Sequence, residues 1–225
     1  MNIWIIVIAV MIASFIIQQT LQSKFRKYSQ IPTPDRLTGA EVASKMLKDN
    51  GITNVRVTCV QGELTDHFNP ETMTVNLSQD VYGQRSIAAA AVAAHECGHA
   101  VQHATGYLPV KLRSALVPVI SVTNQVVPFV LLGGMLLINV FPQLIWVGIG
   151  LFALTTLFTF VTLPVEIDAS RRALAWLSQS DIIDPSNEDE ARGALRAAAY
   201  TYVVAALSSL ATLLYYLSIA SGRRN

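Results

Sequence analysis

The chain contains four long apolar runs, which are separated by more polar segments. The runs contain no charged side chain and cover 3–18, 116–139, 144–165 and 200–220. A helix that crosses a membrane needs about 20 predominantly apolar residues, so the pattern predicts four transmembrane helices. The first run has no basic segment before it and no small-residue cleavage site after it. We therefore interpret it as an uncleaved anchor.

Shorter patterns lie between the first and second apolar runs. Residues 39–50 have the amphipathic pattern of a short helix, which Gly51 ends. Apolar residues alternate with polar ones over 55–59 and over 73–77, before and after a turn-like sequence at 69–71, and this alternation predicts two strands. The second strand either closes a small core or offers its edge to an extended peptide.

Two further helices are predicted outside the apolar runs. An alanine-rich segment follows Ser86, a suitable N-cap, and ends before Gly106, with Pro109 shortly after. Near the C-terminus, Pro185 begins a helix whose first turn is acidic, which favours the positive end of the helix dipole. We expect this helix to continue into the last apolar run.

These patterns predict a mainly α integral membrane protein with a small α+β domain. We divide the chain into five segments. They are an N-terminal transmembrane anchor (1–22), an α+β domain (23–115), a transmembrane hairpin of two helices (116–165), a helical segment (166–199) and a C-terminal transmembrane helix with its tail (200–225).

Composition and charge narrow the class further. Hydrophobic residues make up 52% of the chain and charged residues 14%, against about 25% charged in soluble proteins. The net charge of +1, without a basic stripe beyond the flanks of the spans, argues against nucleic acid as a partner. Lys and Arg concentrate near the membrane on the side of 23–115 and 166–199, so the positive-inside rule places these segments in the cytoplasm. Two cysteines provide no disulfide framework, in agreement with that compartment.

The strongest chemical signal is the sequence His95-Glu96-Cys97-Gly98-His99, which matches H-E-x-x-H. Residues four apart lie on one helix face, so both imidazoles can bind one zinc ion. Glu96 is then placed to take a proton from a metal-activated water that attacks a carbonyl. The alternative is a chance occurrence on a buried helix, although three of the four histidines lie between 95 and 103. His103 is about 12 Å along the helix from His95, too far to share the ion.

A third zinc ligand is expected, since hydrolytic sites usually have three protein ligands and one open position. Glu166 is our candidate, because no acidic residue lies between the motif and Glu166. It stands at a membrane boundary, where an unpaired carboxylate costs free energy. The alternative is an interfacial glutamate that pairs with Arg171 or Arg172.

Other residues are candidates for supporting roles. Asp168, Arg171 and Arg172 either orient a ligand histidine or bind a substrate carbonyl, or they form ordinary ion pairs at a helix end. One further role is a donor that stabilises the oxyanion. The candidates for this donor are the same two arginines, His67 and Tyr200, and the sequence does not choose among them.

Three sequence blocks, at 64–70, 93–102 and 163–170, together resemble the YugP-like bacterial membrane zinc metallopeptidases. The blocks agree in order and spacing, and the resemblance covers nearly the whole chain. The arrangement is more distantly similar to HtpX and the CAAX prenyl proteases, which are gluzincins with a glutamate ligand in an E-x-x-A-D pattern.

The resemblance implies a zincin-like domain of the gluzincin type, one Zn²⁺ per chain, and the inner (plasma) membrane of a bacterial cell. Glu96 is implied as the base. The implied ligands are His95, His99 and Glu166. Where the distant relatives have the Asp of the E-x-x-A-D pattern, this chain has Ser170. Whether Asp168 takes over the role of that Asp is open.

The sequence therefore predicts a membrane zinc metalloendopeptidase that cleaves membrane or membrane-proximal proteins or peptides. One alternative is a membrane scaffold or assembly subunit with a structural or degenerate metal site, against which the intact Glu96 argues. Another is a site-2-type intramembrane protease. That class takes an Asp from a later membrane-embedded segment as its third ligand, whereas no Asp lies between Asp80 and Asp168. The sequence identifies no oligomeric state or regulatory partner.

Overall fold

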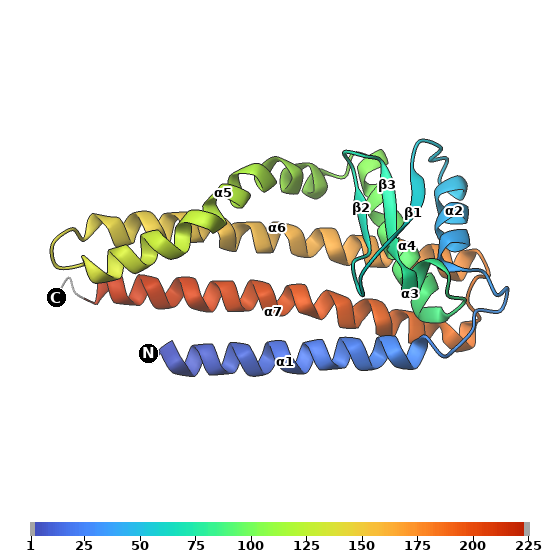
Figure 1. Ribbon diagram of the computed structural model, residues 1–225, viewed down its shortest axis with the longest axis horizontal. Coiled ribbons are helices and arrows are strands. Elements are labelled where there is room, and N and C mark those ends of the chain that lie inside the picture. Colours follow the sequence, from blue (N-terminus) through green and yellow to red (C-terminus); the bar gives the residue numbers. More distant parts are fainter. Residues whose placement is uncertain (1–2, 223–225) are drawn as a thin grey trace.

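The computed structural model describes residues 3–222, which are mostly helical with one small sheet (Figure 1). Helices α1 (Ile3–Tyr28), α6 (Gln143–Gln179) and α7 (Glu188–Ser221) run side by side along the long axis, and α5 (Leu108–Leu136) packs against α6. By length and composition, all four helices are able to cross a membrane, as predicted. The sheet and the shorter helices gather at one end of this bundle.

Helix α5 begins eight residues before the apolar run that predicted it. Pro109 lies in its first turn, where a missing N–H costs nothing, so this proline begins a helix rather than only following the end of α4. Pro118 and Pro128 lie inside α5, and each removes a backbone hydrogen bond. Figure 1 shows that α5 bends along its length and that its first part stands away from α6.

The two longest helices extend beyond the apolar runs at the sheet end. Helix α6 continues to Gln179, well past the apolar run that ends at residue 165. A 3₁₀ turn (Pro185–Asn187) leads into α7, whose first turn is acidic. As predicted, α7 then runs without interruption through the last apolar segment.

The sheet has three strands, β1 (Arg56–Val60), β2 (His67–Asn69) and β3 (Thr74–Ser78), in the order β1-β3-β2. Strands β1 and β3 are parallel and correspond to the two predicted strands, whereas β2 was not predicted. Of the two alternatives for the second predicted strand, a free edge on β3 is excluded, because β1 and β2 pair with its two sides. Strand β2, antiparallel to β3, forms the edge beside α4.

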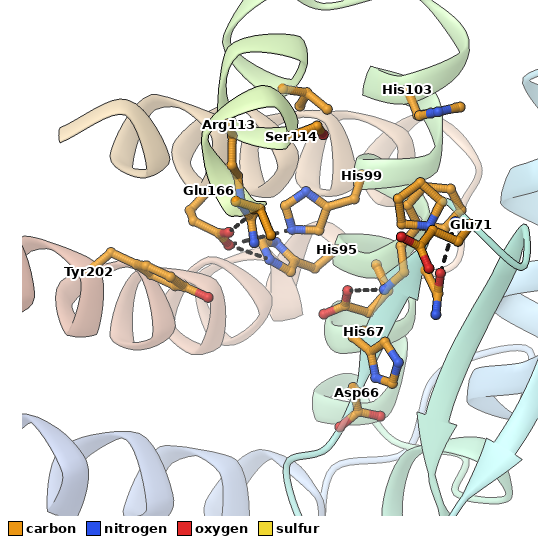
Figure 2. A pocket seen from close by; sticks show the side chains of 16 residues that line it. Asp66, His67, Glu71, His95, His99, His103, Arg113, Ser114, Glu166 and Tyr202 are labelled. Carbon is orange, nitrogen blue, oxygen red and sulfur yellow. Dashed lines mark hydrogen bonds and ion pairs between the residues drawn. The ribbon is translucent and has the colours of Figure 1, made fainter. Parts of the chain in front are cut away.

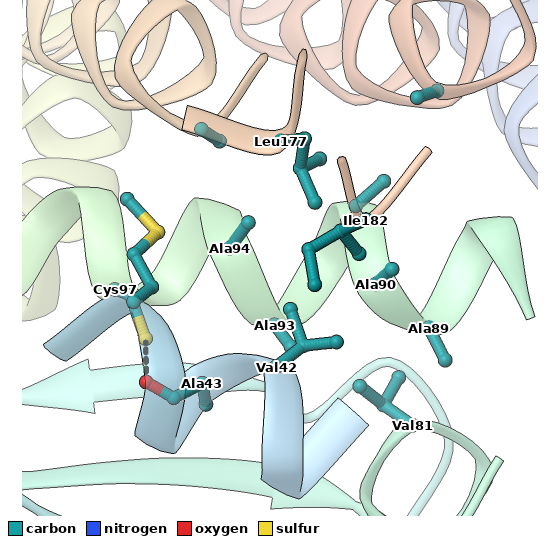
Figure 3. Close-up of a cluster of buried hydrophobic side chains, with 14 of the residues drawn as sticks. Val42, Ala43, Val81, Ala89, Ala90, Ala93, Ala94, Cys97, Leu177 and Ile182 are labelled. Atoms are coloured by element: carbon teal, nitrogen blue, oxygen red, sulfur yellow. Dashed lines mark hydrogen bonds between the residues drawn. The ribbon is translucent and has the colours of Figure 1, made fainter. Parts of the chain in front are cut away.

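The core lies where α4 (Ile87–Ala104) packs between the sheet side and the long helices. Helix α2 (Gly39–Asp49) begins at the predicted position with a capping box between Thr38 and Glu41, and the short α3 (Gln79–Tyr82) follows β3. Figure 3 shows the alanines of α4 facing α2 on one side and Leu177 and Ile182 on the other. Small side chains let these elements approach closely, and this closeness positions the site.

Candidate metal centre

Helix α4 presents the two histidines of the H-E-x-x-H sequence on one face. It begins at the predicted N-cap, Ser86, whose Oγ accepts a hydrogen bond from the N–H of Ala89 at 3.2 Å. One helical turn separates His95 from His99, and their ring centroids lie 4.8 Å apart in an edge-to-face arrangement. Both Nε2 atoms therefore reach the same space.

Glu166 reaches this space from α6 because α4 and α6 pack backbone against backbone. The contact is at Gly98, where a Cβ atom would come within 2.7 Å of the carbonyl oxygen of Ala169. Glu166 itself is buried, with 2% of its surface exposed. A glycine between the two histidines thus sets the distance from them to the carboxylate.

The three side chains form a group that could hold a metal ion, as Figure 2 shows. The Oε2 atom of Glu166 lies 3.3 Å from His95 Nε2 and 3.4 Å from His99 Nε2. Two tetrahedral zinc ligands, each about 2.1 Å from the ion, lie about 3.4 Å from one another. Two imidazole nitrogens and one carboxylate oxygen are also the donor set of hydrolytic zinc sites. The residues present therefore fit a zinc ion.

Each ligand histidine is oriented by a hydrogen bond at its other nitrogen. His95 Nδ1 lies 3.1 Å from the Oγ of Ser170, and His99 Nδ1 lies 3.1 Å from Oε1 of Gln102. Since the Nε2 atoms face Glu166 and the metal position, we assign the proton to Nδ1, which donates in both pairs. Ser170 thus contacts a ligand histidine from the position where the distant relatives carry Asp.

Asp168 contacts neither histidine directly. The fully buried Gln102 donates from Nε2 to the carbonyl of Val165 at 2.8 Å and to Oδ2 of Asp168 at 3.0 Å. Arg171 and Arg172 both donate to the Asp168 carboxylate. Asp168 and the two arginines are therefore connected to His99 only through Gln102, which hydrogen-bonds to both His99 and Asp168.

Arg113, near the start of α5, binds the other oxygen of Glu166. Its Nη1 donates to Oε1 at 3.1 Å, so Oε2 is the carboxylate atom that faces the two histidines. In the sequence, this arginine appeared only as one of the positive charges that flank a span. Nothing in the local sequence pattern could have paired it with a residue 53 positions away.

A cavity of about 480 Å³ opens beside the metal group. It is lined by residues of α4, α5, α6, α7 and the segment that contains β2. Glu96 faces it and is 8% exposed. The Oε2 atom of Glu96 accepts a hydrogen bond of 3.0 Å from the N–H of Phe68, in β2. The candidate base thus lies between the metal group and an edge strand.

The remaining predicted residues are divided between this cavity and the surface. His67 lines the cavity, but its ring is bound to the carbonyl of Thr65 at 2.8 Å and to Asn76 at 3.1 Å, outside the metal group. His103 also lies outside the metal group, as predicted. Tyr200 is 53% exposed and does not line the cavity, whereas Tyr202 of α7, which the sequence analysis missed, does.

Burial and neighbouring carboxylates shift the pKa values of groups around the site. Burial raises the pKa of Asp66, although its carboxylate accepts hydrogen bonds from the N–H and hydroxyl of Ser78. Burial acts to lower the pKa of His99, but the hydrogen bond to Glu166 and the charges of Glu96 and Glu166 together outweigh burial and raise it. Burial also raises the pKa of the Cys97 thiol, which stays protonated and therefore a poor metal ligand.

Comparison with known proteins agrees with this geometry. The model of a family described as "putative neutral zinc metallopeptidase" matches residues 3–221. The chain belongs to this family. It is 43% identical over 212 residues to the "putative membrane protease YugP" of Bacillus subtilis (strain 168). The aligned residues make up 94% of this chain and 93% of the relative. No solved structure matches the chain.

Membership of the family confirms the resemblance expected from the three sequence blocks. The family description names zinc, which the donor set and the distances between His95, His99 and Glu166 also fit. The relative is described as a membrane protease, and the chain has four helices able to span a membrane. The findings therefore agree on a membrane protein that belongs to the "putative neutral zinc metallopeptidase" family.

Proposed function

We propose that the chain is a zinc metalloendopeptidase of the gluzincin type that cleaves proteins at or near a membrane. The observation that carries the proposal is the convergence of His95, His99 and Glu166 beside Glu96 at one cavity. A zinc ion held by the three ligands would polarise a peptide carbonyl and lower the pKa of water.

Glu96 is the proposed general base. Its carboxylate faces the cavity and adjoins the first ligand histidine, so it can take a proton from the attacking water and return it to the leaving amide nitrogen. The hydrogen bond from the N–H of Phe68 holds one carboxylate oxygen in place. A structural metal site would have no use for a carboxylate at this position.

Tyr202 is the proposed donor to the oxyanion that forms on the peptide carbonyl. Such a donor must face the reacting carbon, and Tyr200, Arg171 and Arg172 do not line the cavity. Tyr202 does, and Figure 2 shows its hydroxyl pointing towards the side of the cavity that holds His95. His67 also lines the cavity, but its ring nitrogens are bound to Thr65 and Asn76. We therefore prefer Tyr202 to the candidates from the sequence.

The edge of β2 is the proposed docking site for the substrate backbone. One side of β2 pairs with β3, while Phe68, in the middle of β2, directs its N–H to Glu96 at the cavity. An extended peptide can add to such an edge through backbone hydrogen bonds, which places a peptide bond near the base. This binding mode requires an unfolded substrate segment.

The cavity lies close to the ends of two apolar runs, which favours membrane-proximal substrates. Glu166 directly follows the run 144–165, and Tyr202 lies at the start of the run 200–220. Both ends lie at the expected surface of the bilayer. By the positive-inside rule, this surface is proposed to be the cytoplasmic side of a bacterial inner membrane.

The test compares the full-length wild-type chain in detergent with Glu96→Gln and Glu166→Ala. We expect about one zinc per chain in the wild type and in Glu96→Gln, because the base is not a ligand. Glu166→Ala should lose most of its zinc. The wild type should cleave casein and a membrane protein, Glu166→Ala should not, and Glu96→Gln should have a kcat lower by about 10²-fold or more. Glu71→Gln, which changes an exposed carboxylate of the same cavity, is the matched control.

Three outcomes would contradict parts of the proposal. Full zinc content in Glu166→Ala would exclude it as the third ligand. Equal cleavage by wild type and Glu96→Gln would exclude Glu96 as the base. A wild type that neither binds zinc nor cleaves any substrate would favour the alternative of a membrane scaffold or assembly subunit.

A further inference from the structure

A second cavity, of about 250 Å³, lies between α6 and α7 and shares no lining residue with the cavity beside the metal group. Four residues of α6, between 167 and 174, and four of α7, between 192 and 199, line it. One part of its lining is basic and the other apolar. The basic side chains are those of Arg171, Arg192 and Arg196, and the apolar ones are those of Ile167, Leu174, Leu195 and Ala199.

The basic part carries more positive charge than its neighbours neutralise. Glu188 pairs with Arg192, and Asp168 is shared between Arg171 and Arg172. Within residues 3–222, Arg196 forms no ion pair, and its side chain is exposed. Four arginines thus meet two carboxylates, and no acidic side chain lines the cavity itself. The excess positive charge favours binding of an anion here.

The cavity lies at the level of lipid head groups. On α6, its lining residues follow the apolar run 144–165, and on α7 they precede the apolar run 200–220. With a rise of about 1.5 Å per residue, both sets lie within about 14 Å of the end of the apolar segment. Ile167, whose surface is 49% exposed, lies on the membrane side of this level.

Ser170 adds a neutral donor to the lining. Its Oγ accepts the hydrogen bond from His95 Nδ1, as assigned above, so the hydroxyl hydrogen is available to another acceptor. Arginine forks and a hydroxyl donor suit phosphate oxygens, while an apolar wall suits the start of acyl chains. Basic pockets between transmembrane helices bind anionic lipid head groups in this way.

We propose that this cavity binds the phosphate head group of an anionic phospholipid. The lipid belongs to the leaflet on the side of the sheet, and its acyl chains extend along the apolar surfaces of α6 and α7. The proposal does not depend on peptidase activity, since it rests on the charge, level and lining of the α6–α7 cavity alone.

The experiment measures the thermal unfolding midpoint of the full-length chain in non-ionic detergent. Phosphatidylglycerol, phosphatidylcholine or inorganic phosphate is titrated into wild type, into the double variant Arg192→Gln/Arg196→Gln, and into Arg56→Gln. Arg56 is an exposed arginine of β1 and serves as the control. Zinc content and circular dichroism check that each variant folds.

We expect phosphatidylglycerol to raise the Tm of wild type and Arg56→Gln, and phosphatidylcholine to leave it unchanged. The double variant should need about 25-fold more phosphatidylglycerol for the same shift, because each arginine contributes a factor of about five near an anionic lipid. An equal shift in the double variant would overturn the site. An equal shift of the wild type with inorganic phosphate would overturn the lipid as its ligand and indicate a soluble phosphate anion.

Discussion

Each candidate ligand is held at a second atom by a neighbour, so hydrogen bonds within the protein orient the ligand group. Ser170 orients His95, Gln102 orients His99, and Arg113 binds the second oxygen of Glu166. Such neighbours tune metal affinity by fixing the direction of the ligand lone pair and the tautomer of the ring. The geometry of the centre therefore depends on residues that touch no metal themselves.

The substitution Ser170→Ala tests this dependence at His95. Removing the hydroxyl leaves Nδ1 without its acceptor, so we expect zinc affinity to fall by about 10- to 100-fold. Competition with a chromogenic chelator measures the affinity. Ser170→Asp, which restores the residue of the distant relatives, should retain tight binding. Ser180→Ala, at the end of the same helix, is the control. Unchanged affinity in Ser170→Ala would show that His95 needs no partner at Nδ1.

Local sequence signals predicted some site residues and could not predict others. Glu166 was predictable because a carboxylate beside an apolar segment costs free energy unless it forms an ion pair or binds a metal. Gln102 had a usable signal, since a residue three positions after His99 lies on the same helix face. Arg113 and Tyr202 had none, because only the packing of α5 and α7 brings them to the cavity.

At the scale of elements, the contact between α4 and α6 determines whether a metal site exists at all. The histidines belong to α4 and the carboxylate to α6, and the two helices approach most closely at Gly98 and Ala169. The glycine of the H-E-x-x-H sequence is thus a packing residue. Any side chain at this position separates the two halves of the ligand group.

We therefore expect Gly98→Ala to weaken both folding and metal binding. The added Cβ would lie 2.7 Å from a backbone oxygen, which forces α6 away from α4. Overpacking of this kind costs about 1–3 kcal/mol, measured as the loss in free energy of unfolding. Zinc content should fall with it. Gly150→Ala, in the same helix as Glu166 but with open space around it, should change neither quantity. Full zinc loading of Gly98→Ala would show that the helices tolerate a wider separation.

The secondary structure was predictable where one element has its own periodicity. The alternation of apolar residues identified β1 and β3, the amphipathic pattern over 39–50 identified α2, and the N-cap Ser86 identified the start of α4. Strand β2 has only three residues and is defined by its pairing with β3, which local pattern does not encode. The cavity edge next to Glu96 was missed for this reason.

At the scale of the whole molecule, the sheet, α4 and the cavity gather at one end of four helices that are able to cross a membrane, so we expect them on one side of the bilayer. The apolar runs alone predicted these four helices, because each run is about long enough to cross the bilayer. They did not predict that α6 and α7 continue beyond the apolar segments. These extensions carry Glu166 and the residues of the second cavity.

The two native cysteines test the orientation of this topology. Cys59 is exposed on β1, whereas Cys97 is buried in α4. If the sheet is cytoplasmic, a membrane-impermeant maleimide should label Cys59 only after the cells are broken. Cys97 should stay unlabelled until the protein is denatured. As a control, Ser221→Cys in a Cys59→Ser background should be labelled in intact cells. Labelling of Cys59 in intact cells would place the site outside.

The division of the ligands between α4 and α6 has a consequence for biosynthesis. Glu166 follows His95 by 71 residues, and α5 together with most of α6 lies between them. During translation, the ribosome therefore releases both histidines well before the carboxylate. The carboxylate can join them only after α5 and α6 have inserted and folded back as a hairpin. Under the proposed function, a newly made chain would thus remain inactive until α5 and α6 have been inserted, so synthesis would not expose other proteins to premature proteolysis.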